Sequence, residues 1–280
     1  MVLTDNDIYL KVIWLGMENG VEVFVGQKDN YEVKGFFASG GMGDIFEALD
    51  SRGNEVLIKV PKKFSAGRND PMNNQVISEI ENLKLLIHPN VVKYVDTGKN
   101  GSKPFLVMEK IYGISLKEHI EDIDYSYEFA TNVCKGVISA LQYLRTRRVV
   151  HRDISHLNII ISDNIPKIID FSTSIRIPEE MDSVKLKGSR IGTENFSAPE
   201  QLNEGTVYID SDIYSLGAVT YYSLTGLKPE KYKKDVKQIE RYSDLPLYYI
   251  ISNTLQEKRA DRIRDLSVLS RAIDGNTDKK

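Results

Sequence analysis

The sequence contains very little cysteine, with Cys134 the only one among 280 residues. One cysteine excludes a disulfide framework within the chain and makes a reducing cytoplasm the expected location. No apolar run approaches the roughly 20 residues of a membrane-spanning helix, and the first residues, MVLTDNDIYL, lack the pattern of a signal peptide. The net charge of −3 gives no strong attraction to nucleic acid or anionic lipid. We therefore expect a cytoplasmic protein with neither a nucleic-acid nor a membrane partner.

The hydrophobic pattern divides the chain into a β-rich part and a helical part. Hydrophobic residues make up 41% and charged residues 28%, as in soluble globular proteins. Strands are predicted at 8–15, 21–25, 31–38, 45–49, 55–60, 91–96 and 104–109, and helices at 72–87, 125–147, about 210–225 and 265–273. Short β-type runs at 158–162 and 166–171 interrupt the helices. A small antiparallel half with one helix thus precedes a larger helical half, which predicts an α+β fold with a boundary near Glu109–Gly113.

A glycine-rich stretch, Ser39-Gly40-Gly41-Met42-Gly43, lies between two predicted strands. Glycines in such a turn let backbone N–H groups approach phosphate oxygens without interference from side chains. The segment lacks the Gly-Lys-Ser/Thr that follows in a P-loop. Taken alone, it indicates an ordinary hairpin turn more strongly than a phosphate loop.

Lys59 ends a strongly apolar strand, EVLIKV, so its charge needs an explanation. A buried lysine requires a carboxylate partner, because an unpaired buried charge is costly. Glu79 lies on the same face of the next predicted helix as Leu83 and Leu86, so it should point inward. Glu81 falls nearer the solvated side. A surface helix often carries glutamates without such a role, so the pair is a weak signal by itself.

The stretch HRDISHLN, residues 151–158, contains histidine, arginine, aspartate and asparagine within eight residues. Asn158 follows Asp153 by five residues, and Asp170 follows in IIDF. Magnesium prefers oxygen ligands and usually keeps waters or substrate phosphates as the rest. Asn158 and Asp170 are therefore candidate metal ligands, and Asp153 is left to orient a hydroxyl nucleophile. Asp and Asn are also common turn residues, and each one alone is better explained that way.

Taken in order, these motifs resemble the eukaryotic-type (Hanks-type) protein kinase family, in its Ser/Thr branch, over residues 31–273. Other segments fit the same pattern: Leu106–Glu109, Gly192-Thr193, Ala198-Pro199-Glu200 and Ser211–Gly217. Arg262 stands where the family pairs an arginine with the glutamate of Ala-Pro-Glu, here Glu200. The resemblance implies a bilobal fold with an N-terminal extension at 1–30, a small lobe at 31–109 and a large lobe at 110–280. The kinase domain itself would cover about 31–275.

The resemblance also implies an activity and a set of site residues. ATP is expected between the lobes, with magnesium as its metal and manganese as an alternative, and proteins as substrates. Lys59, Asp153 and Asn158 would be catalytic, and Asn158 and Asp170 would hold the metal. The residues expected around ATP are Ala38, Gly40, Gly41, Gly43, Ile45, Leu57, Lys59, Glu79, Met108, Glu109, Ile111 and Ile160.

Four positions depart from the family pattern. Ala38 replaces the first glycine of the phosphate loop, and Leu57 replaces a small alanine that faces adenine. Ser172 replaces the glycine after Asp-Phe. Ser155 replaces the lysine that touches the γ-phosphate, and a positive charge is lost there. Other cations are available as substitutes: His156, Lys185, Lys187 and Arg190. These departures argue for lowered or redirected activity more than for none.

Two features allow regulation or assembly. Arg152 occupies the position where the family often binds a phosphorylated residue of the activation segment, and Ser183, Ser189 and Thr193 are candidates. Those hydroxyl residues equally suit a solvated loop. The hairpin within residues 1–30 would extend the sheet, cover an edge of it, or mediate a homodimer.

Three function hypotheses follow from the sequence. The first is a protein Ser/Thr kinase that transfers the γ-phosphoryl group of ATP and phosphorylates itself. The second is a pseudokinase or ATP-binding regulatory module, suggested by Leu57 and Ser155. The third is a kinase-like small-molecule phosphotransferase, which the Ala-Pro-Glu segment and the long activation loop make less favourable.

Overall fold

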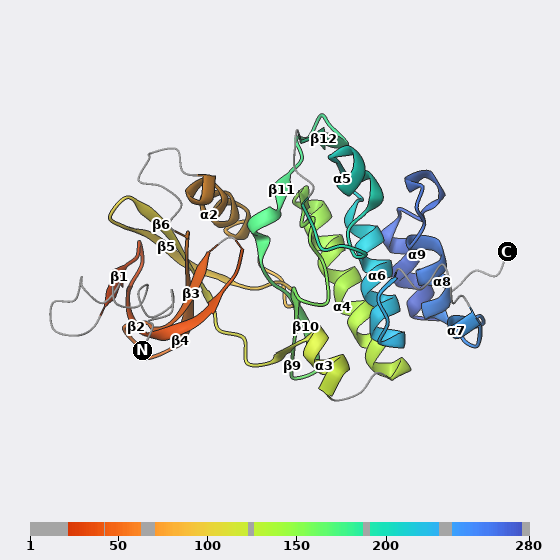
Figure 1. Cartoon of the computed structure of the whole chain (residues 1–280), viewed down its shortest axis with the longest axis horizontal. Coiled ribbons are helices and arrows are strands. Elements are labelled where there is room, and N and C mark those ends of the chain that lie inside the picture. Colours follow the sequence, from red (N-terminus) through yellow and green to blue (C-terminus); the bar gives the residue numbers. More distant parts are fainter. Residues whose placement is uncertain are drawn as a thin grey trace, which may run out of the picture. The chain divides into compact units, whose positions relative to one another are not determined.

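The computed structural model describes residues 22–41, 43–62, 71–122, 126–186, 191–229 and 237–275. These residues form two compact units. The first consists of the described residues up to Ile80 together with Tyr94–Lys110, and the second of Glu81–Lys93 together with the described residues from Ile111 onward. Strands dominate the first unit and helices the second (Figure 1). This α+β content agrees with the fold class expected from the pattern.

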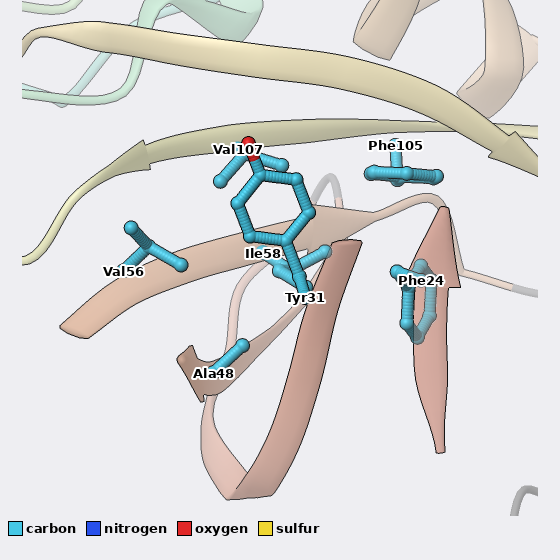
Figure 2. Packing of buried hydrophobic residues seen from close by; sticks show 7 residues of the cluster. All are labelled: Phe24, Tyr31, Ala48, Val56, Ile58, Phe105 and Val107. Atoms are coloured by element: carbon cyan, nitrogen blue, oxygen red, sulfur yellow. The ribbon is translucent and has the colours of Figure 1, made fainter. Parts of the chain in front are cut away.

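The first unit is one antiparallel sheet with a helix. Its elements are β1 (Val23–Val25), β2 (Asn30–Ser39), β3 (Asp44–Leu49), β4 (Glu55–Val60), α2 (Pro71–Leu83), β5 (Tyr94–Asn100) and β6 (Lys103–Glu109). The strand order is β1-β2-β3-β4-β6-β5. One face of the sheet buries a cluster made of Phe24, Tyr31, Ala48, Val56, Ile58, Phe105 and Val107 (Figure 2).

The N-terminal strand completes this sheet. Of the expected hairpin, only residues 22–25 fall within the described residues, and Val23–Val25 pair with β2. A bridge between Gly26 and Gly98 also joins the segment to β5. Phe24 packs edge-on against Phe105 in the core, with ring centroids 5.0 Å apart. The segment therefore extends the sheet and covers an edge, and these contacts give no support to a homodimer through it.

The second unit is built around helices. Its helices are α3 (Leu116–Asp122), α4 (Tyr127–Thr146), α5 (Pro199–Glu204), α6 (Asp212–Thr225), α7 (Lys237–Glu240), α8 (Pro246–Thr254) and α9 (Leu266–Ile273), with 3-10 turns η1 (Phe171–Thr173) and η3 (Arg259–Asp261). Its short strands are β7 (Ile114–Ser115), β8 (Val149–Val150), β9 (Ile159–Ser162), β10 (Ile165–Ile168), β11 (Ile175–Arg176), β12 (Ser183–Lys185) and β13 (Thr206–Tyr208). Helix α6 is buried on every side and contacts both α4 and α8 (Figure 1).

Close packing fixes the position of α6. A Cβ atom added to Gly217 would lie 2.3 Å from Thr254 Oγ1 on α8, so only glycine allows this approach. The apolar period alone predicts α6 but gives no sign of this contact.

Helix α2 ends earlier than its apolar period suggests. The helix was expected to reach residue 87, but it stops at Leu83. The N–H of Ile87 donates to Tyr143 Oη at 2.8 Å, so it is withdrawn from the helical ladder. Just after the helix end, Leu85 N donates to Asn82 O and Leu86 N donates to Leu83 O, so the backbone makes turn bonds in place of helical ones.

Four of the seven helices of the described second unit were not predicted: α3, α5, α7 and α8.

Candidate active site

The glycine-rich loop joins β2 and β3. Ser39 Oγ donates to Asp44 Oδ1 at 2.7 Å, and Gly40 N donates to Gly43 O at 2.9 Å. A Cβ atom on Gly43 would lie 2.5 Å from the backbone oxygen of Val60, so this glycine is required for the loop to lie against β4. Ala38 of β2 pairs with Ile45 of β3, and its φ is negative, so the missing first glycine causes no backbone strain.

One face of the sheet gathers the residues expected around the nucleotide. Directly paired residues point to the same side of a sheet. Pairing joins Ala38 to Ile45, Ile45 to Lys59, and Leu57 to Met108. Val56 and Ile58 alternate with Leu57 and Lys59 and are in the hydrophobic cluster on the opposite face. Ala38, Ile45, Leu57 and Met108 therefore share one face of the sheet with Lys59. Glu109, also expected near the nucleotide, pairs with Val56 and lies on the opposite face of β6.

Lys59 forms a buried ion pair with Glu79. Lys59 Nζ lies 2.8 Å from Glu79 Oε2 and 3.1 Å from Oε1. The two residues are 4% and 1% exposed. Glu81, two residues further along α2, is exposed. The pairing expected from the helical period is therefore present, and the buried carboxylate offsets the cost of burying the ammonium.

The second unit fixes Asp153 with three hydrogen bonds. Asn158 Nδ2 donates to Asp153 Oδ2 at 2.8 Å. Thr193 N and Thr193 Oγ1 both donate to Asp153 Oδ1 at 2.7 Å. Residues 40 positions apart thus meet on one carboxylate. The sequence pattern predicted that Asp153 and Asn158 lie close together. It gave no sign that the hydroxyl and the backbone N–H of Thr193 would donate to Asp153.

The backbone before Asp153 is held by Asp212, at the start of α6. The N–H groups of His151 and Arg152 donate to the Asp212 carboxylate at 2.7 and 2.9 Å. Arg152 has a φ of 73°, a conformation that non-glycine residues rarely adopt. Burial raises the pKa of Asp212, while these hydrogen bonds act against the rise. The sequence predicted a helix at about 210–225 but gave this aspartate no role.

Asn158 and Asp170 lie on adjacent strand ends. Ile169 N donates to Asn158 O at 2.9 Å, which brings the residue before Asp170 against Asn158. Asp170 is in the left-handed region, and its Oδ1 accepts from Ser172 N at 3.3 Å. Ser172 has a negative φ, so the serine in place of glycine is tolerated.

The donor set fits a hard divalent cation that shares its ligands with a nucleotide. Asn158 Nδ2 is committed to Asp153, which leaves Oδ1 of the same amide for a metal. Within the described ranges there is no group of three or more His, Cys, Asp or Glu residues that could hold a metal ion. One amide oxygen and one carboxylate are what magnesium accepts when phosphates and water complete its shell.

Ser155 and His156 do not replace the missing lysine. Ser155 is fully buried, and its Oγ accepts from Leu157 N at 3.4 Å. His156 stacks on Phe196 at 4.6 Å and meets Tyr222 edge-on. Burial, with smaller effects of Lys228 and Lys117, lowers the pKa of His156 to about 4. The imidazole is therefore neutral at pH 7, and its expected role as a substitute cation is wrong.

The remaining site residues can also be placed. Ile160 is half-buried in β9, and Glu109 and Ile111 are half-buried on either side of the boundary between the units. Lys185 is exposed on β12. Ser189, Lys187 and Arg190 lie outside the described residues, as does Met42. Arg262 forms the expected bidentate pair with Glu200, with both N–O distances 2.7 Å.

Comparison with known proteins agrees with this geometry. The family model described as the protein kinase domain matches residues 31–271. The serine/threonine-protein kinase PknB of Mycolicibacterium smegmatis is 33% identical over 208 residues, which is 72% of this chain and 33% of that protein. The enzyme of the same name from Mycobacterium tuberculosis H37Rv is 33% identical over 209 residues, with the same shares. The probable PknB of Corynebacterium glutamicum is 31% identical over 208 residues, 72% of this chain and 32% of that protein.

The chain thus spans about a third of the length of the curated relatives it matches. In the part of the chain that is described, no helix is both long and apolar enough to cross a membrane.

Proposed function

Because the chain belongs to the protein kinase domain family, we propose that it is a protein Ser/Thr kinase that transfers the γ-phosphoryl group of ATP to protein hydroxyls. The observation that supports this most strongly is the set of three hydrogen bonds on Asp153. They fix the carboxylate so that it can orient a substrate hydroxyl and accept its proton, which is catalysis mainly by positioning. Thr193, as one of the donors, favours the Ser/Thr branch that the relatives' names suggest.

Lys59 and Glu79 are proposed to serve the nucleotide. An ammonium held by a buried carboxylate is a fixed positive charge, suited to the α- and β-phosphates. The glycines of the loop between β2 and β3 would allow backbone N–H groups to approach the same chain of phosphates. Leu57, on the same face as Lys59, would narrow the space for adenine.

Asn158 and Asp170 are proposed to hold magnesium, with manganese as an alternative. A bound divalent cation would neutralise charge on the phosphates. Asn158 would then perform two tasks, since its Nδ2 donates to Asp153 and its Oδ1 would be available to hold the metal. The family as a whole uses ATP and a divalent metal, whereas the choice of metal is part of this proposal.

The competing interpretation is a pseudokinase, and it rests on Ser155 and Leu57. Neither change touches the contacts of Asp153. The adjacent His156 is neutral at pH 7 and does not replace the lost charge. We therefore expect slower transfer than in enzymes that keep the lysine, and not its absence.

Phosphate transfer to a generic protein substrate tests the proposal. The protein is incubated with γ-labelled ATP and magnesium beside Asp153→Asn, Lys59→Ala and Asp170→Ala. Each change should reduce incorporation by at least about 100-fold. The matched control is Asp163→Asn, an exposed turn residue with φ of 48°, where asparagine fits equally well. Equal incorporation by Asp153→Asn would defeat the assignment, and magnesium-dependent ATP binding without transfer would favour the pseudokinase.

We also propose that the activation segment is phosphorylated by the protein itself. Arg152 is 4% exposed, and its Nε and Nη2 atoms have no hydrogen-bond partner, while Nη1 donates to Thr173 O. Burial lowers the pKa of Arg152, and the charges of Asp212 and Asp153 act against this. A phosphate that reaches the guanidinium would bind the two nitrogens that lack a hydrogen-bond partner. The hydroxyl of Thr193 is engaged on Asp153, which favours Ser183 and Ser189 as sites. Mass spectrometry would detect phosphate on the parent and not on Asp153→Asn; equal phosphate on both would argue against self-phosphorylation.

A further inference from the structure

A polar cleft in the second unit has no part in the proposed reaction. Its volume is about 880 Å³, which is within the range of ligand sites. Four segments line it: the end of α4, the residue before β12, the residues after β13, and the stretch that leads into α9. The polar and charged lining residues are Gln142, Arg145, Thr146, Asp182, Asp210, Arg259, Arg262, Arg264, Asp265 and Ser267.

Two of the four arginines are already neutralised. Arg262 donates to both carboxylate oxygens of Glu200. Arg259 donates to both oxygens of Asp210 at 2.7 and 2.8 Å and lies over the Tyr208 ring. These pairs form the wall of the cleft and leave little charge for a ligand.

The other two arginines keep most of their donors. Arg145 Nη1 donates to Arg264 O at 2.7 Å, which holds the two residues together. The side chain of Arg264 is 49% exposed, and its guanidinium is 3.9 Å from Asp210, a carboxylate that Arg259 already satisfies. A guanidinium has five N–H donors in a planar fork that matches phosphate. Most of the donors of these two side chains are therefore available to a ligand.

The carboxylates of Asp265 and Asp182 compete only weakly with a ligand for the guanidinium groups of Arg145 and Arg264. Asp265 Oδ1 accepts from Ser267 N and Ser267 Oγ, and these bonds, with Arg145 and Arg271, lower the pKa of Asp265. Asp182 is exposed and has no charged partner in the described part of the chain. Asp182 would therefore repel an anion, so removing its charge should strengthen anion binding, whereas removing an arginine should weaken it.

We propose that this cleft binds a phosphorylated side chain of a peptide, held between the guanidinium groups of Arg145 and Arg264. Phosphate is favoured over a carboxylate because two forks can each engage it with paired N–H bonds. The choice of a peptide rests on the proposed function, since a protein kinase acts on protein segments. Binding of the phosphate group itself does not depend on that function.

The cleft also adjoins the activation segment. Ile209, which lines it, donates through its N–H to Asp182 O at 3.0 Å. This bond continues the ladder in which Ser183, Val184 and Lys185 pair with Tyr208, Val207 and Thr206. A peptide in the cleft would contact the end of that ladder where Asp182 and Ile209 meet.

Fluorescence polarisation without nucleotide tests the proposal separately from phosphoryl transfer. The probe is a fluorescein-labelled phosphoserine peptide with alanine and glycine flanks, and the comparison is the same peptide with serine. Arg145→Gln and Arg264→Gln should each weaken binding of the phosphopeptide about tenfold. Asp182→Asn should strengthen it about twofold to fivefold, and raising the salt concentration should weaken it. Glutamine keeps an amide donor for the Arg264 carbonyl, so the fold should be preserved.

The matched control is Arg271→Gln, because Arg271 is exposed on α9 and does not line the cleft. Its affinity should stay within about twofold of the parent. An equal loss in Arg271→Gln, or equal binding of the serine peptide, would overturn the proposal. Displacement of the probe by inorganic phosphate at the same concentration as by unlabelled phosphopeptide would overturn the choice of a peptide. Loss of phosphopeptide binding in Arg145→Gln, with unchanged thermal unfolding, would support the proposed site.

Discussion

Replacing Glu79 by glutamine should destabilise the first unit strongly, because it leaves the ammonium of Lys59 buried without a counter-charge. Removal of one partner of a buried ion pair costs about 3–5 kcal/mol. At about 2–4 °C per kcal/mol for a domain of this size, the midpoint of thermal unfolding should fall by at least roughly 6 °C. Glu81→Gln makes the same chemical change on the exposed side of α2, and it should shift the midpoint by less than about 2 °C. Circular dichroism during heating measures both.

A double variant separates stability from activity. Lys59→Met with Glu79→Leu removes both charges and keeps similar volumes, and such replacements are often neutral or stabilising. Its unfolding midpoint should return to within about 3 °C of the parent, while phosphate transfer should stay absent because no cation remains. If Glu79→Gln unfolds at the same temperature as Glu81→Gln, the pair is not buried in solution and the reasoning fails. Recovery of transfer in the double variant would show that Lys59 has no role in catalysis.

Three further outcomes can be measured. Burial lowers the pKa of His156 in the folded chain to about 4, from its ordinary value of 6.5, so the unfolded chain binds the proton first as the pH falls. The contribution of this histidine to stability should be full above pH 6.5 and decline toward pH 4. His156→Phe should flatten this decline in unfolding midpoints measured across that range. Thr193→Ala should reduce kcat about tenfold to 100-fold by releasing one donor from Asp153, and Thr193→Ser should restore most of it in steady-state assays. Gly217→Ala should cost about 1–3 kcal/mol in denaturant unfolding because its Cβ meets a hydroxyl on α8, whereas Gly35→Ala, with open space around it, should cost less.

Features set by short-range patterns were the ones that the sequence predicted well. Strand β4 has the bounds expected from the apolar run EVLIKV. Glu79 is buried and Glu81 exposed because a helical period of 3.6 residues separates their faces. The proximity of Asp153 and Asn158 follows in the same way, since five residues of one tight loop cannot lie far apart.

Features that depend on distant contacts could not be read from the pattern. Asp212 holds the backbone of His151 from 61 residues away, and its position at the start of an apolar helix was the only available signal. The ladder between β12 and β13 joins three-residue segments with ordinary compositions. Val207 of β13 is buried with Val150 and Ile177, and Val184 of β12 packs against this cluster. These contacts form only when the chain is folded.

The effect of each departure from the family pattern depends on the surroundings of the substituted residue. Ala38 and Ser172 sit where the backbone has negative φ, so their side chains cost little. Ser155 differs because it removes a charge, and its neighbour in the chain does not restore that charge. Its hydroxyl accepts a hydrogen bond within its own loop, and the adjacent His156 is neutral at pH 7. The hydrogen bonds on Asp153 do not involve Ser155. If Asp153 orients the hydroxyl as proposed, the substitution weakens stabilisation of the transferred phosphate and leaves orientation of the nucleophile intact, so it should lower kcat without changing which hydroxyl is used.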